Sequence, residues 1–253
     1  MRRPLQMILL VLSGIGLLRV SLFTDLYLRY VKEGMRPLLI ASGVLLILLG
    51  AADAVAYVRR REGDAHTDHG DDGHGHHHSG APRAAWLLFL PALSLLFHAP
   101  PALGAYTASR QPSKAVTYED EGEGDFEPLP ATSPLPMTLS DFTRRVRQDR
   151  TQAIKGRTVL LTGFVTSGDQ GDSWFLTRIM ISCCAADAQS VKVRIHGTPA
   201  PPADTWVAVT GTWHPGGTLG TRSAPAALDA RSVEKIAKPV NAYTDALPLT
   251  PTR

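Results

Sequence analysis

The run Val191-Lys192-Val193-Arg194-Ile195-His196 alternates apolar and polar side chains without a break. Successive side chains of a β-strand point to opposite faces, so this alternation predicts a strand with one buried face. Four further runs are rich in the β-branched and aromatic residues of strands: 158–166, 174–181, 206–213 and 227–236. Five short strands separated by turn residues predict a small all-β, OB-like barrel over residues 138–240.

A short helix is predicted at the start of this domain. Leu139, Phe142 and Val146 follow one another at the spacing of one helix face. Thr138 or Ser140 can supply the N-cap, because a hydroxyl oxygen accepts a hydrogen bond from a free amide of the first turn. We therefore expect the barrel to carry a short leading helix.

Three apolar stretches precede the domain and predict an α-helical membrane region over residues 1–106. They lie near residues 5–24, 37–58 and 84–105, and each approaches the roughly 20 residues that cross a bilayer as a helix. Bulky residues follow the first stretch where a signal peptide would need a small-residue cleavage site, which predicts an uncleaved anchor. The chain is therefore expected in the cell membrane as a multi-pass protein.

The basic residues beside these stretches predict an orientation. Short cytoplasmic loops carry an excess of Lys and Arg. Arg59, Arg60 and Arg61 form a tight cluster at the end of the second stretch, which favours an N-terminus inside the cell. Three spans then place the C-terminal domain outside the cytoplasm.

A histidine-rich loop at residues 62–80 separates the second stretch from the third. Its histidines are interleaved with aspartate and glycine and are His66, His69, His74, His76, His77 and His78. Imidazole and carboxylate suit zinc and other divalent metal ions, so the loop is predicted to collect such ions weakly. A spacer whose histidines bind nothing is the alternative.

Two further segments have the composition of connecting chain. Residues 107–137 are acidic, rich in proline and without periodicity, and they predict an extended linker. Residues 241–253 are expected to form a C-terminal tail.

The two cysteines of the chain, Cys183 and Cys184, stand side by side after the strand predicted at 174–181. A thiolate is both a nucleophile and a soft metal ligand, so thiol chemistry in this protein belongs here. Three interpretations stay open: packing of two small apolar side chains, binding of a thiophilic solute or metal ion, and redox chemistry. Asp187 is expected to shape the turn and to complete the ligand-binding set.

Six segments of the domain carry recognisable motifs, and they are residues 139–142, 155–159, 162–165, 175–178, 181–187 and 206–212. Together these segments resemble the YcgQ-like family of two-component membrane permease subunits. The Cys-Cys-Ala-Ala-Asp signature is the strongest of the motifs, and the membrane half matches in hydropathy. The resemblance implies a partner, a separate multi-span permease of the class that includes organoarsenical exporters, and it specifies no substrate.

These observations favour an accessory subunit of a permease complex that offers its cysteines to a thiophilic solute or metal ion. A structural or assembly subunit without a ligand is the main alternative. A nucleic-acid module is a weaker alternative and no nucleic-acid partner is expected, because the basic excess is modest and the domain is predicted outside the cytoplasm. The sequence contains no motif of a nucleophile with its base, so no enzymatic activity is expected.

Overall fold

The computed structural model describes residues 2–63, 103–111, 126–168, 173–240 and 242–247. The chain forms two compact units. One unit comprises Met1–Thr24 and Arg36–Ala102, and the other comprises Asp25–Met35 and Leu103–Arg253. The inter-helix loop, Asp25–Met35, therefore belongs to the same unit as the C-terminal domain.

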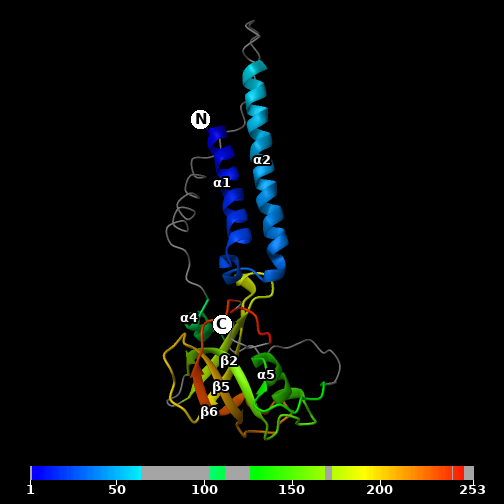
Figure 1. Ribbon diagram of the computed structural model, residues 1–253, viewed down its shortest axis with the longest axis vertical. Helices are drawn as coiled ribbons and strands as arrows, with labels where there is room; N and C mark the ends of the chain where they lie inside the picture. The colour runs from blue at the N-terminus through cyan, green and yellow to red at the C-terminus, as the bar shows by residue number, and fades with distance from the viewer. Residues whose placement is uncertain (1, 64–102, 112–125, 169–172, 241, 248–253) are drawn as a thin grey trace. The chain divides into compact units, whose positions relative to one another are not determined.

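The first unit is built on two long helices, α1 (Arg2–Phe23) and α2 (Arg36–Gly63), which lie side by side (Figure 1). Glycines allow this close approach. A Cβ added at Gly14 would lie 2.6 Å from the carbonyl oxygen of Gly43. Small residues at a helix crossing are typical of helices that pair in membranes, where close backbone packing supplies the association energy.

Both helices are long and apolar enough to cross a membrane, over Gln6–Phe23 and Glu33–Arg59. This agrees with the first two predicted spans. The third predicted span at 84–105 and the histidine-rich loop at 62–80 lie outside the described residues, apart from the ends of these ranges.

The second unit contains a mixed β-sheet. Its strands are β1 (Leu135–Pro136), β2 (Thr158–Ser167), β3 (Trp174–Met180), β4 (Gln189–His196), β5 (Trp206–Trp213) and β6 (Ala227–Lys235). The five longer strands confirm the sequence-based predictions to within two residues at each end. The strand order is β1-β2-β3-β4-β6-β5, and β2 also pairs with β5.

The sheet is mixed because β1 and β2 are parallel, as are β4 and β6, whereas the other neighbours are antiparallel. The predicted alternation in β4 is confirmed, since Val191, Val193 and Ile195 are buried in one core cluster. Trp174 and Leu176 of β3 lie in the same cluster, opposite Ile195 and Val193. The core thus sits on the face that the alternation marks as apolar.

The leading helix α5 (Leu139–Gln148) is also confirmed. Leu139, Phe142 and Val146 are fully buried against the sheet. Thr138 is the N-cap, and its side-chain oxygen accepts a hydrogen bond from the Asp141 amide at 3.0 Å. This bond satisfies one of the amides that a helix leaves free in its first turn.

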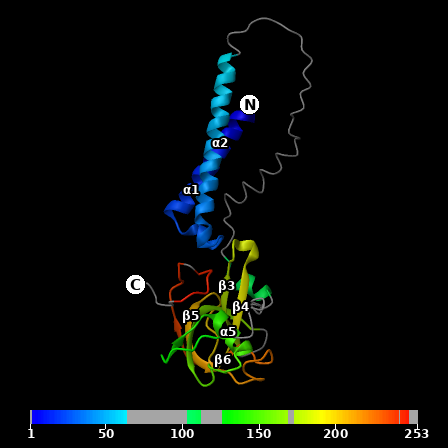
Figure 2. The same cartoon turned by 90° about the vertical axis from the view of Figure 1, so that its right-hand side faces the viewer.

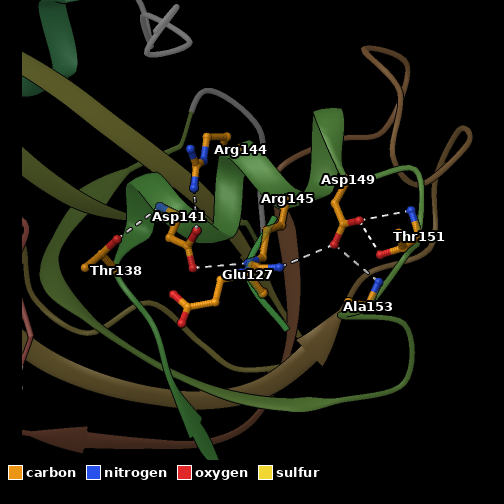
Figure 3. Close-up of polar contacts among 8 residues, drawn as sticks. All are labelled: Glu127, Thr138, Asp141, Arg144, Arg145, Asp149, Thr151 and Ala153. Atoms are coloured by element: carbon orange, nitrogen blue, oxygen red, sulfur yellow. Dashed lines mark hydrogen bonds and ion pairs between the residues drawn. The ribbon is translucent and has the colours of Figure 1, made fainter. Parts of the chain in front are cut away.

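Ion pairs and hydrogen bonds of charged side chains connect α5 to the neighbouring segments (Figure 3). The buried guanidinium of Arg145 lies 3.3 Å from the carboxylate of Asp141 and 3.5 Å from that of Asp149. It also donates to the backbone oxygen of Glu127 at 2.9 Å. A buried charge needs this number of partners, because desolvation would otherwise exclude it from the interior.

Residues 103–111 pack on the sheet through a short helix, α4 (Ala105–Arg110), which contacts β2. Lys192 of β4 donates to the carbonyl oxygen of Gln111 at 2.8 Å. The Ala105 amide donates to a carboxylate oxygen of Asp204 at 2.6 Å. The charged side chains of Lys192 and Asp204 are therefore both engaged by this segment.

The described part of the C-terminal tail, 242–247, folds back on the domain. The amide of Ile181 donates to the Tyr243 carbonyl oxygen at 3.1 Å. Asp245 accepts hydrogen bonds from the amides of Leu139 and Ser140, at 3.3 and 2.7 Å, and lies 3.7 Å from Nε of Arg178. The carboxylate thus caps α5 and pairs with a buried arginine at once.

Candidate functional site

The cysteines lie on the turn that joins β3 to β4, residues 181–188, called the Cys-Cys turn below (Figure 2). β3 ends at Met180, a 3-10 helix covers Ala185–Asp187, and β4 begins at Gln189. Cys183 is exposed, Cys184 is half-buried, and both are free thiols. The sulfurs are therefore presented at the end of a hairpin and not packed in the core.

Asp187 fixes the backbone of this turn. One of its carboxylate oxygens accepts a hydrogen bond from the Ser182 amide at 2.9 Å, and the other accepts from the Cys183 amide at 2.7 Å. The Asp187 amide donates in turn to the carbonyl oxygen of Cys184 at 3.0 Å. Both oxygens are thus engaged by the backbone, so this carboxylate orders the turn and is poorly placed to coordinate an ion as well.

The structure brings the three predicted residues of this site together. The Asp187 carboxylate, and next the neighbouring Cys184 thiol, raise the pKa of Cys183 from its ordinary 9.0 to about 11. The same interaction with Cys183 lowers the pKa of Asp187. Near neutral pH the pair is thus a thiol beside a carboxylate.

This protonation state bears on the chemistry that the turn can perform. A redox-active or nucleophilic cysteine needs a lowered pKa, because the thiolate is the reactive species. Cys183 has the opposite shift. A soft centre can still bind, because it displaces the thiol proton, and the Asp187 carboxylate lies next to that proton.

The inter-helix loop pairs with the Cys-Cys turn. Val31 stands opposite Cys184 in an isolated antiparallel bridge. The Lys32 amide donates to the carbonyl oxygen of Cys183 at 3.1 Å, and the Ala185 amide donates to that of Tyr30 at 2.7 Å. This pairing could not be predicted from the sequence. Backbone hydrogen bonds between distant segments leave no periodic pattern in the side chains.

Among the residues that the structure describes, no group of three or more His, Cys, Asp and Glu side chains is arranged to hold a metal ion. The six predicted ligands of the histidine-rich loop lie outside those residues, and they are His66, His69, His74, His76, His77 and His78. For zinc, the Cys-Cys turn supplies two thiols of a set of four ligands.

His196 and His214, which could add imidazole ligands to the thiols, lie at the end of β4 far from the Cys-Cys turn. His196 ends β4, which begins beside the Cys-Cys turn, and eight residues of strand separate the two ends by about 23 Å. Its ring stacks on His214 with centroids 4.2 Å apart, and Nδ1 of His214 lies 2.7 Å from Asp229. Burial, and next the His214 ring, lower the pKa of His196.

The C-terminal domain is similar to a known protein family. Residues 139–244 match the DUF1980 C-terminal domain. The match supports the resemblance to the YcgQ-like family, and the matched DUF1980 region runs from α5 to the start of the tail and contains the whole Cys-Cys turn. The inter-helix loop that pairs with this turn lies outside the DUF1980 match.

No curated protein matches the chain. Among solved structures, a candidate aspartyl-tRNA synthetase from Leishmania major Friedlin is similar at 15% identity and a TM-score of 0.25. The alignment covers 49% of this chain and 24% of the synthetase chain, so this protein spans about a quarter of that relative.

Proposed function

We propose that the protein is an accessory subunit of a membrane permease complex whose Cys-Cys turn binds a thiophilic solute. The observation that carries this proposal is the presentation of two adjacent free thiols on an ordered, partly exposed hairpin end. Two candidate membrane helices in the same chain support a location at the membrane. The multi-span permease partner follows from the family resemblance.

Soft trivalent arsenicals suit this pair of sulfurs. A monosubstituted arsenical, such as phenylarsine oxide, accepts two thiols, forms two As–S bonds and releases one water. Both thiol protons leave with the arsenical oxygen, so the reaction needs no oxidant and no thiolate at the start. A turn ordered by Asp187 keeps the two sulfurs close before the solute arrives, which reduces the entropy lost on binding.

We further infer that the domain is an OB-like barrel outside the cytoplasm. The pairings β2–β3, β3–β4, β4–β6, β6–β5 and β5–β2 form a ring of five strands, which is the connectivity of a closed small barrel. The parallel β4–β6 pair within an otherwise antiparallel ring supports the OB-like topology. The orientation rests on the Arg59, Arg60 and Arg61 cluster.

A structural or assembly role is the second candidate. The pairing of the turn with the inter-helix loop favours it, because the turn then serves as a docking element. The raised pKa of Cys183 leaves less of the reactive thiolate, which is compatible with this role. A nucleic-acid role has less support, since Lys192 of β4 is bonded to Gln111 and α4 packs on β2.

Titration with phenylarsine oxide separates these candidates. We expect the full-length protein in detergent to bind one equivalent, and the Cys183→Ala/Cys184→Ala double variant to bind none while melting at the same temperature. Ser182→Ala is the matched control, because it changes a neighbouring side chain and leaves both thiols. Equal binding by the double variant would end the thiophile proposal, and a large loss of stability would favour the structural role.

A further inference from the structure

The side chains of Val31 and Cys184 face the same side of their bridge. The two hydrogen bonds of this bridge join the neighbouring residues, Lys32 to Cys183 and Ala185 to Tyr30. In an antiparallel pair, this pattern marks a non-hydrogen-bonded position, where the opposed Cα atoms are about 4.5 Å apart and side chains are closest. Both Val31 and Cys184 are accordingly half-buried.

We propose that the inter-helix loop is the second wall of the thiol site, with Val31 covering Cys184 and the backbone of residues 30–32 positioning both cysteines. This inference rests on the proposed function and names how that site is regulated. A solute that bridges the two sulfurs must pass or displace Val31. Thiol occupancy and the pairing of the loop are therefore linked, and by reciprocity each alters the other.

The loop also has a distinctive place in the chain. Asp25–Met35 belongs to the unit of the C-terminal domain, yet it is continuous with α1 on one side and α2 on the other. A change in the pairing of this loop therefore acts directly on the adjoining ends of the two candidate membrane helices. This is the kind of connection that an accessory subunit needs in order to report solute binding to the membrane.

Ala185→Pro removes one hydrogen bond of this pairing with little other disturbance. Proline has no amide hydrogen, so the bond to the Tyr30 carbonyl is lost. Ala185 is the first residue of its 3-10 helix, a position that tolerates proline. The residue before it, Cys184, has φ −149° and ψ 170°, the extended conformation that proline requires of its predecessor. Ala185→Ser retains the amide and is the matched control.

The first measurement is hydrogen–deuterium exchange of the full-length protein in detergent micelles, followed over Asp25–Met35. Loss of one neutral hydrogen bond should speed exchange at Lys32 by about fivefold in Ala185→Pro relative to Ala185→Ser. Equal exchange in the two variants would show that the hydrogen bond from Ala185 to Tyr30 does not hold the inter-helix loop against the Cys-Cys turn, and it would overturn the proposed wall. This measurement needs no ligand, so it stands apart from the thiophile proposal.

The second measurement tests the cover over Cys184. In a Cys183→Ser background Cys184 is the sole thiol of the chain. Val31→Ala should then raise the rate of N-ethylmaleimide labelling several-fold, whereas Val31→Thr, which keeps the branched shape, should not. Equal rates for both variants would show that Val31 does not cover the thiol and would overturn that part of the proposal.

The third measurement links the wall to the solute. Phenylarsine oxide should change the exchange of residues 30–32 in the wild type and leave it unchanged in Cys183→Ala/Cys184→Ala. If the wild type does not bind phenylarsine oxide, the proposed function fails and the wall is judged by the first two measurements. If it binds and the loop does not respond, the wall is overturned and the proposed function stands.

Discussion

At the scale of single residues, Asp187 determines the state of the Cys-Cys turn. Its carboxylate accepts hydrogen bonds from two backbone amides and raises the pKa of Cys183, so one side chain both shapes the turn and keeps that thiol protonated. Sequence reasoning identified Asp187 as a residue that shapes the turn. The direction of the Cys183 pKa shift could not be read from the sequence, because it depends on where the carboxylate lies after folding.

Asp187→Asn should therefore lower the pKa of Cys183 from about 11 toward its ordinary 9.0, since the largest cause of the shift is removed. A lower pKa means more thiolate near neutral pH and faster alkylation. The pH dependence of iodoacetamide labelling, compared with and without Asp187→Asn in a common Cys184→Ser background, isolates the part of the shift due to the carboxylate, because Cys184 supplies a further part. An unchanged profile would show that the carboxylate does not control the thiol, and Asp204→Asn, which changes a different carboxylate in the chain, is the control.

At the scale of elements, the sequence predicts those strands and helices whose apolar side chains recur at a regular period. The period of two in β4 and the helical spacing of Leu139, Phe142 and Val146 were sufficient to predict a strand and a helix with their buried faces. β1 was missed because two residues, Leu135 and Pro136, are too few to show a period. The bridge of Val31 was missed because backbone pairing does not require a particular side chain.

The tail segment 242–247 joins α5 to β3 and gives an element-scale prediction. Asp245→Asn removes the ion pair with Arg178, leaves a buried guanidinium unpaired and weakens the cap of α5. Removing one member of a buried pair typically costs about 3 kcal/mol. Denaturant unfolding of the C-terminal domain should show a loss of about this size. Arg144→Gln, which breaks the exposed ion pair with Asp141, should cost less than about 1 kcal/mol.

At the scale of the whole molecule, the grouping of the inter-helix loop with the C-terminal domain constrains how the chain can be arranged in a membrane. If α1 and α2 both cross, the loop between them lies on the side opposite the N-terminus. The domain belongs to the same compact unit as this loop. The domain must then lie on the loop's side, which is the side that three predicted spans also require.

Reporter fusions give this argument a direct test in cells. We expect fusions inserted at residue 30 and after residue 140 to report the same, extracytoplasmic side, and fusions near residue 70 to report the cytoplasm. If the fusions at residues 30 and 140 report the same side, the loop and the domain lie together as one compact unit. Which side they report tests the orientation predicted from Arg59, Arg60 and Arg61. Opposite results at 30 and 140 would separate the loop from the domain, and the pairing of Val31 with Cys184 could not then exist in the membrane-inserted protein.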